Sequence, residues 1–104
     1  MKQVLLLITT ENNKKGAKKI AKLLLKKKLA SCVSLKKIYS IYEWEGNIEK
    51  VNEVEITIKS IPELKNVLID FLQKMITYDV PQIIFKKFNS EKKYINWLNN
   101  KISN

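Results

Sequence analysis

The single cysteine of the chain is one candidate for chemistry. Cys32 follows Ala30 and Ser31 at the start of an apolar run, and Lys36 and Lys37 lie a few residues further on. A small apolar thiol is most often a buried core side chain. A reactive or metal-binding thiolate instead needs an exposed, electropositive setting, which the two lysines could supply. The core interpretation is favoured, and the ligand interpretation stays open.

Two further stretches carry polar groups that could line a cleft. Tyr78 and Asp79 precede Pro81 in a predicted loop, where sites gather, although Asp79 could equally bond its own backbone in a turn. Glu53 and Lys59 share one face of a predicted strand, where a cross-strand ion pair of about 0.2–1 kcal/mol is the more common outcome. The candidate cleft residues are therefore Cys32, Glu53, Lys59, Tyr78 and Asp79.

Enzymatic chemistry has little support in the sequence. The chain has no histidine for general-base work and no arginine to bind an acyl phosphate. Its two glycines, Gly16 and Gly46, cannot build a phosphate-binding loop, and the GxSxG and CxxC motifs are missing. We expect a protein that is not an enzyme and that holds no cofactor.

The charge suggests a second class of function. Twenty lysines against ten acidic residues give a net charge of +10, which would attract polyanions such as nucleic acid. Lysine lacks the fork with which arginine reads guanine, and the predicted strands lack the basic-aromatic signature of RNA-recognition modules. The lysines of residues 14–28 fit a solvated helix face better. Nucleic-acid binding is the alternative, and a weak hard-cation site at Glu53, Glu55 or Asp79 is a third hypothesis.

Alternation and helical spacing predict the elements that position these residues. Residues 4–8 form an apolar run typical of a central strand, and residues 14–28 show the apolar spacing of a helix that Asn12 or Asn13 can cap. Residues 30–44 and 49–59 predict two strands joined by a turn at residues 45–47. The apolar phase of the first strand slips at Lys36 and Lys37, which predicts a bulge or bend there.

The second half of the chain predicts two helices and a strand. Ser60 and Glu63, with Pro62 between them, form a capping box that starts a helix reaching about residue 77. Residues 80–85 suit a short strand with Pro81 near its beginning. Ser90 can cap a last helix. The order is β-α-β-β-α-β plus a helix, so we expect an α+β, ferredoxin-like antiparallel sheet in a single domain of residues 1–104.

The central hairpin is too long for such a domain. At about 3.3 Å per residue, residues 30–44 would extend roughly 50 Å, whereas a compact domain of this size is about 35 Å across. Part of the hairpin must overhang, and an overhanging strand edge with exposed aromatic side chains needs cover. We expect other copies of the chain to supply it, with the interface at Tyr39, Ile41, Tyr42 and Trp44.

The bulk sequence also suggests a compartment. One cysteine excludes an internal disulfide, which fits a reducing, cytoplasmic environment. Residues 4–8 are too short for the apolar core of an export signal, and no apolar run approaches the length of a membrane span. A leader removed earlier would leave no trace in this sequence.

Several blocks together resemble one known family, the CutA or divalent-cation-tolerance proteins. They are VLLLITTEN at residues 4–12, LASCVSL at 29–35, IYEWEG at 41–46, EVEITIKS at 53–60 and YDVPQII at 78–84. The resemblance implies a ferredoxin-like homotrimer whose long hairpins pair with neighbouring subunits. It also implies a PII-like architecture, in which small ligands or weakly held metal ions bind at subunit clefts, and a role in divalent-metal tolerance.

One position departs from the family pattern. Where the family typically has His-Pro-Tyr-Glu-Val-Pro, this chain has Ile76-Thr77-Tyr78-Asp79-Val80-Pro81. The histidine nominated as a copper ligand is therefore replaced by Ile76. Copper and zinc favour imidazole and thiolate ligands, so we expect no transition-metal site within one subunit.

Overall fold

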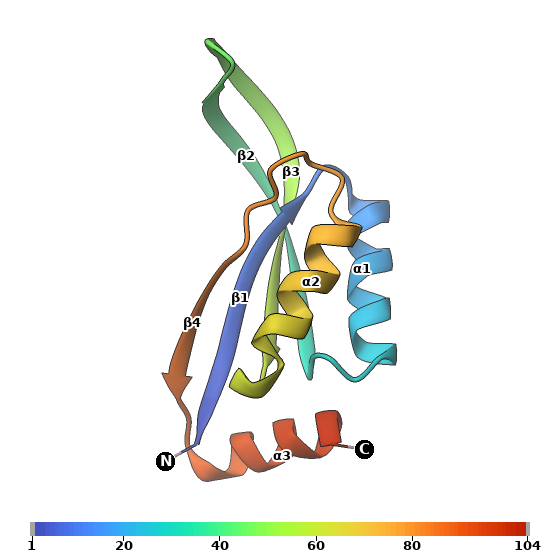
Figure 1. Cartoon of the computed structure of the whole chain (residues 1–104), viewed down its shortest axis with the longest axis vertical. Coiled ribbons are helices and arrows are strands. Elements are labelled where there is room, and N and C mark those ends of the chain that lie inside the picture. The colour runs from blue at the N-terminus through green and yellow to red at the C-terminus, as the bar shows by residue number, and fades with distance from the viewer. Residues whose placement is uncertain (1, 104) are drawn as a thin grey trace.

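The structure is a computed structural model that describes residues 2–103, and it contains four strands and three α-helices (Figure 1). This is the α+β element order predicted from the sequence, with the extra helix at the C-terminal end. The elements in chain order are β1 (Gln3–Glu11), α1 (Lys14–Lys26), β2 (Cys32–Trp44), β3 (Asn47–Ser60), the 3₁₀ turn η1 (Pro62–Leu64), α2 (Lys65–Met75), β4 (Ile84–Asn89) and α3 (Lys92–Ser103).

The four strands form one sheet in the order β2-β3-β1-β4, and each neighbouring pair is antiparallel. The strand order places β1 and β3 in the centre, as the ferredoxin-like prediction requires. Strands β2 and β3 are joined by a two-residue turn in which Glu45 and Gly46 both have positive φ, 50° and 83°. That geometry matches the right-handed twist of the two strands.

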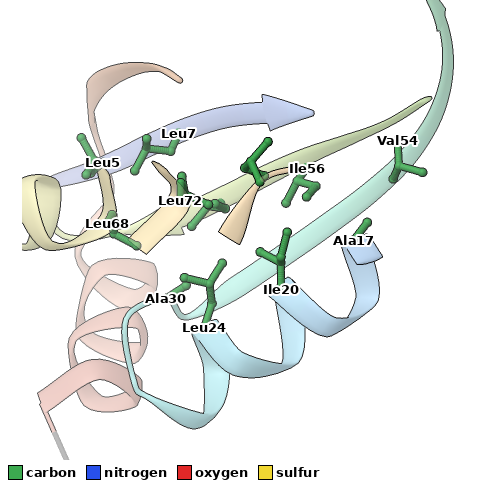
Figure 2. Close-up of a cluster of buried hydrophobic side chains, with 12 residues drawn as sticks. Leu5, Leu7, Ala17, Ile20, Leu24, Ala30, Val54, Ile56, Leu68 and Leu72 are labelled. Carbon is green, nitrogen blue, oxygen red and sulfur yellow. The ribbon is translucent and has the colours of Figure 1, made fainter. Parts of the chain in front are cut away.

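The main core lies between one face of the sheet and the helices α1 and α2. Alternate side chains of β1, such as Leu5 and Leu7, point to this face, and Ile20 and Leu24 of α1 meet them there with Leu72 of α2 (Figure 2). The period of two along the strand and the helical spacing along α1 therefore bring the apolar side chains of both elements into one core. Within residues 2–103, α1 and α2 both lie on this one face of the sheet.

Helix α1 begins where the sequence predicts. Asn13 is its N-cap, and the Asn13 side-chain oxygen accepts a hydrogen bond of 2.8 Å from the backbone N–H of Gly16. The helix ends at Lys26, and Lys28 takes up a left-handed conformation with φ of 57° just beyond it. The Asn13 prediction is confirmed.

Helix α3 closes the end of the sheet where β1 begins (Figure 1). Ile95 and Leu98 pack against Val4 in a second, smaller cluster. The predicted Ser90 cap is wrong: the carboxylate of Glu91 accepts the backbone N–H groups of Lys93 and Tyr94 at 2.8 and 2.5 Å. A carboxylate is the better partner for the positive end of the helix dipole.

The hairpin overhangs the body, as predicted from its length. Pairing of β1 with β3 ends at Glu11 and Val54, whereas pairing of β2 with β3 continues to Trp44 and Asn47. Residues 38–53, here called the arm, therefore extend beyond the central strand by seven residues on β2, or about 23 Å. The molecule measures 46 × 24 × 22 Å in consequence, and the arm is the free end of the hairpin in Figure 1.

Two details predicted for the hairpin and its exit are wrong. The register between β2 and β3 runs without interruption from Cys32 to Trp44, so there is no bulge. The apolar phase changes because the helix layer covers Val33 and Leu35 on one face, whereas beyond that cover apolar side chains lie on both faces of the strand. The predicted capping box is also absent, since the Ser60 hydroxyl donates to the carbonyl oxygen of Leu29 at 2.6 Å. Helix α2 starts only after the 3₁₀ turn.

The last strand lies four residues later than predicted. Strand β4 pairs with β1 from Ile84 opposite Ile8 to Asn89 opposite Gln3, and all six of its residues are exposed. An edge strand with an exposed pattern lacks the apolar run by which buried strands are found. Residues 80–83 instead belong to the connection from α2.

Candidate functional site

A groove of about 630 Å³ begins at the base of the arm and reaches Trp44, next to the turn at the tip. One wall is the arm, and the other is the connection between α2 and β4. The arm and the end of β1 contribute Thr10, Ser40, Ile41, Tyr42, Trp44, Glu49 and Glu53, and the connection contributes Thr77, Tyr78, Asp79, Val80 and Gln82. Its volume falls in the usual range for small-molecule sites. We call it the arm-base groove.

The connection is anchored to the end of β1 by a buried carboxylate. Glu11 is only 2% exposed, and its Oε1 atom accepts hydrogen bonds from three donors. These are the backbone N–H of Asn12 at 3.0 Å, the backbone N–H of Thr77 at 3.3 Å and the Thr77 hydroxyl at 2.5 Å. A hydrogen bond to a charged group is worth roughly twice a neutral one. Glu11 therefore fixes where the loop after α2 begins.

Gly16 makes room for this carboxylate. A Cβ at this position would lie 3.3 Å from Cγ of Glu11 and 3.4 Å from the Asn13 side-chain oxygen. The contact with Glu11 is tight, so a larger residue at this position would press on the anchor.

A second contact joins the loop directly to the arm. The Tyr78 hydroxyl donates to Oε1 of Glu53 at 2.9 Å, and Tyr78 also packs against the main core. Burial of the ring and then the hydrogen bond and charge of Glu53 raise the pKa of Tyr78 well above its ordinary value. The phenol is thus held in its protonated form as a donor to the carboxylate.

Three of the five predicted cleft residues come together in the groove, and two do not. Glu53, Tyr78 and Asp79 all line it. Cys32 and Lys59 lie directly opposite each other on β2 and β3, at the end of the hairpin away from the arm. Cys32 is half-buried and has a free thiol. Of the hard-cation candidates, Glu55 lies outside the groove lining, opposite Lys36 in the register.

The predicted interface residues all lie on the arm and are exposed in the single chain. Tyr42 and Trp44 share the face that lines the groove, whereas Tyr39 projects from the other face. Ile41 is 61% exposed. Ile48, which was not predicted, is a further exposed apolar residue of the arm. The arm therefore offers apolar side chains on both faces.

The donor set does not fit a copper ion. Ile76, at the position of the family histidine, is 6% exposed and belongs to the main core. Among residues 2–103, no three His, Cys, Asp or Glu side chains are placed so that they could hold a metal ion together. The groove carboxylates are hard donors that stand apart from Cys32.

Several residues that line or anchor the groove were not predicted, Glu49 and Glu11 among them. Glu49 lies opposite Tyr42 on the arm, and only this strand pairing places its carboxylate in the groove. Glu11 did carry a signal: it continues the core-facing alternation of Leu5, Leu7 and Thr9, so its carboxylate had to be buried.

In the part of the chain that the structure describes, no helix is both long and apolar enough to cross a membrane.

Comparison with known proteins identifies relatives along most of the chain. Residues 5–101 match the family model described as CutA1 divalent ion tolerance protein. A divalent-cation tolerance protein CutA from Pyrococcus horikoshii is 32% identical over 96 residues, which cover 91% of this chain and 94% of the relative. Protein CutA from Homo sapiens is 44% identical over 69 residues, which cover 65% of this chain but only 38% of the human protein.

A solved structure agrees in fold. The divalent ion tolerance protein CutA1 from Ehrlichia chaffeensis superposes with a TM-score of 0.91 at 33% identity, covering 98% of this chain and 97% of that one. The sequence blocks, the strand order and the overhanging hairpin thus agree with the family match along almost the whole chain. The chain belongs to the CutA1 divalent ion tolerance protein family.

Proposed function

We propose that the protein is a homotrimeric, non-enzymatic binding scaffold that contributes to tolerance of divalent metal ions. The tolerance role comes from the names of its relatives. The observation that supports self-association is the arm, which extends beyond the central strands of the sheet and exposes apolar side chains on both faces.

The arm is unsuited to stand alone in water. Beyond Glu11, residues 47–53 of β3 pair only with β2, so both outer edges of this two-stranded segment are free. Isolated two-stranded hairpins are marginally stable, and free apolar edges attract further strands. Other copies of the chain would cover these edges and the side chains of Tyr39, Ile41, Tyr42 and Trp44. The number of three rests on the family resemblance.

The scaffold would act by binding rather than by catalysis or through a resident cofactor. The arm-base groove has the size of a small-molecule site, and its polar groups are carboxylates, amides and hydroxyls. Such groups suit a small molecule or a weakly held cation. Self-association would place three such grooves in one assembly, each at a subunit boundary because Tyr42 and Trp44 belong both to the groove and to the proposed interface.

The cytoplasm is the compartment we propose, on the strength of the single reduced cysteine. Relatives are named for other compartments, one from Arabidopsis thaliana as chloroplastic and one from Archaeoglobus fulgidus as periplasmic. Fractionation of the source cells with an antibody against the chain tests this part; recovery outside the cytoplasmic fraction would contradict it.

Sedimentation of tag-free protein over a dilution series tests the assembly. The expected species has three times the 12.2 kDa of one chain at micromolar concentration. A single-chain species at tens of micromolar would contradict the proposal. Calorimetric titration with copper, zinc, calcium and magnesium then tests the cation part, for which we expect weak binding at most and no tight copper site.

A further inference from the structure

We propose that the arm-base groove binds a linear aliphatic polyamine. The inference rests on the ligand-binding role proposed above and names the class of ligand. It is argued from the charge of the groove, its aromatic walls and the spacing of its carboxylates.

The charge of the groove runs against that of the chain. Lysines outnumber acidic residues by 20 to 10 in the sequence, yet the groove is lined by Glu49, Glu53 and Asp79 and by no lysine. Among residues 2–103, no ion pair joins a lysine to any of these three carboxylates. Only Glu53 has a hydrogen bond, from Tyr78, and that bond takes one of its oxygens. The groove therefore has negative charge to offer a cation from solution.

The walls favour an organic cation over a metal ion. Three aromatic residues, Tyr42, Trp44 and Tyr78, line the same groove. Aromatic faces attract ammonium groups and pack against methylene chains. A bare divalent ion instead needs several oxygen ligands that converge on one point, and among the described residues no three His, Cys, Asp or Glu side chains are grouped to hold one. Carboxylates that are spread along an aromatic wall suit a long, flexible cation better.

The spacing of the carboxylates sets the shape of the ligand. Glu49 and Glu53 are four residues apart on β3, so their Cα atoms are separated by about 13 Å. Glu49 lies opposite Tyr42 near the outer end of the groove, and Glu53 holds Tyr78, the neighbour of Asp79, at the inner end. A compact monovalent cation can reach only one end. An aliphatic chain with ammonium groups at both ends reaches both.

Spermidine is the probe, and Trp44 is the reporter. Trp97, the other tryptophan, lies exposed on α3 and does not line the groove, so a Trp97→Phe chain leaves Trp44 as the single tryptophan, whose fluorescence can be excited selectively over that of the tyrosines. We expect a saturable change in Trp44 fluorescence with one spermidine bound per chain, and calorimetry on the unaltered chain should give the same stoichiometry. Choline and Mg²⁺, at matched ionic strength, should bind at least tenfold more weakly.

Variants that remove the same charge at different places distinguish binding in the groove from nonspecific attraction to the overall charge of the protein. Asp79→Asn and Asp70→Asn each remove one carboxylate, but Asp70 is an exposed residue of α2 outside the groove. Asp79→Asn and Glu49→Gln should each weaken spermidine binding at least threefold, and Asp70→Asn should leave it unchanged. Equal effects of Asp79→Asn and Asp70→Asn, a signal that does not saturate, or tighter binding of Mg²⁺ than of spermidine would each overturn the proposal.

The mass of the protein, measured in the same samples, keeps the two proposals apart. Trimers that do not respond to spermidine would overturn the polyamine site and leave the assembly standing. Single chains that bind spermidine would overturn the assembly and leave the site standing.

Discussion

Removal of the Glu11 carboxylate should loosen the loop that forms one wall of the arm-base groove. Glu11→Ala leaves three donors without their acceptor: the N–H groups of Asn12 and Thr77 and the Thr77 hydroxyl. A hydrogen bond to a charged group contributes about 1.5–3 kcal/mol, and the three share one oxygen, so their sum is less than additive. We expect the free energy of unfolding to fall by about 3–5 kcal/mol.

Two comparisons make this prediction specific. Glu11→Gln keeps an acceptor oxygen in place and loses only the charge, so it should cost about 1–2 kcal/mol. Glu63→Ala removes an exposed carboxylate and should change stability by no more than about 0.5 kcal/mol. Urea unfolding of all four proteins at one protein concentration measures the differences. A Glu11→Ala variant as stable as Glu63→Ala would refute the anchoring role of Glu11.

Three further predictions concern assembly, pH and the core. Ile41→Ala should weaken self-association about tenfold per contact, because Ile41 is exposed in one chain and burial of an isoleucine is worth about 1.5–3 kcal/mol. Sedimentation should show no such change for Val67→Ala, at an exposed position of α2. Tyr78→Phe should lose less stability than the wild type between pH 9 and 11. The folded chain raises the Tyr78 pKa, so this contribution is complete below about pH 10 and is lost as the pH rises further; equal losses in both proteins would contradict it. Leu24→Ala should cost about 2–5 kcal/mol in urea unfolding, whereas Leu25→Ala, at the exposed neighbouring position, should cost under about 1 kcal/mol; similar costs would place the core on the wrong side of α1.

The sequence predicted the parts of the fold that periodicity and chain length govern. The apolar run before Asn13 and the helical spacing after it gave β1, α1 and the cap at Asn13. The overhang of the arm followed from the length of the hairpin alone, and the register confirms it.

The errors share a physical cause, since each concerns a residue whose partner is distant in sequence. Ser60 looks like a helix cap beside Glu63, but its hydroxyl bonds Leu29, 31 residues away. The phase slip at Lys36 looked like a bulge, although it reflects where the helix layer ends over the sheet. Strand β4 was placed too early because nothing in an exposed edge strand marks its register with β1.

The groove was only partly predictable for the same reason. Tyr78 and Asp79 stood out as polar loop residues, and Glu53 as a polar strand residue, but their meeting depends on the connection that crosses from α2 to β4. Cys32 and Lys59 stood out by residue type, yet the register places them at the other end of the hairpin. Residue type alone does not distinguish the two ends of a strand pair.

Hydrogen exchange of the backbone amides in residues 38–53 tests most directly whether other copies cover the arm. A covered arm should exchange slowly, with protection near that of the central strand β1. An arm that stands free is a two-stranded hairpin in water and should exchange orders of magnitude faster than β1. Slow exchange that persists at micromolar concentration is the expected result, and rapid exchange throughout the arm would contradict self-association through it.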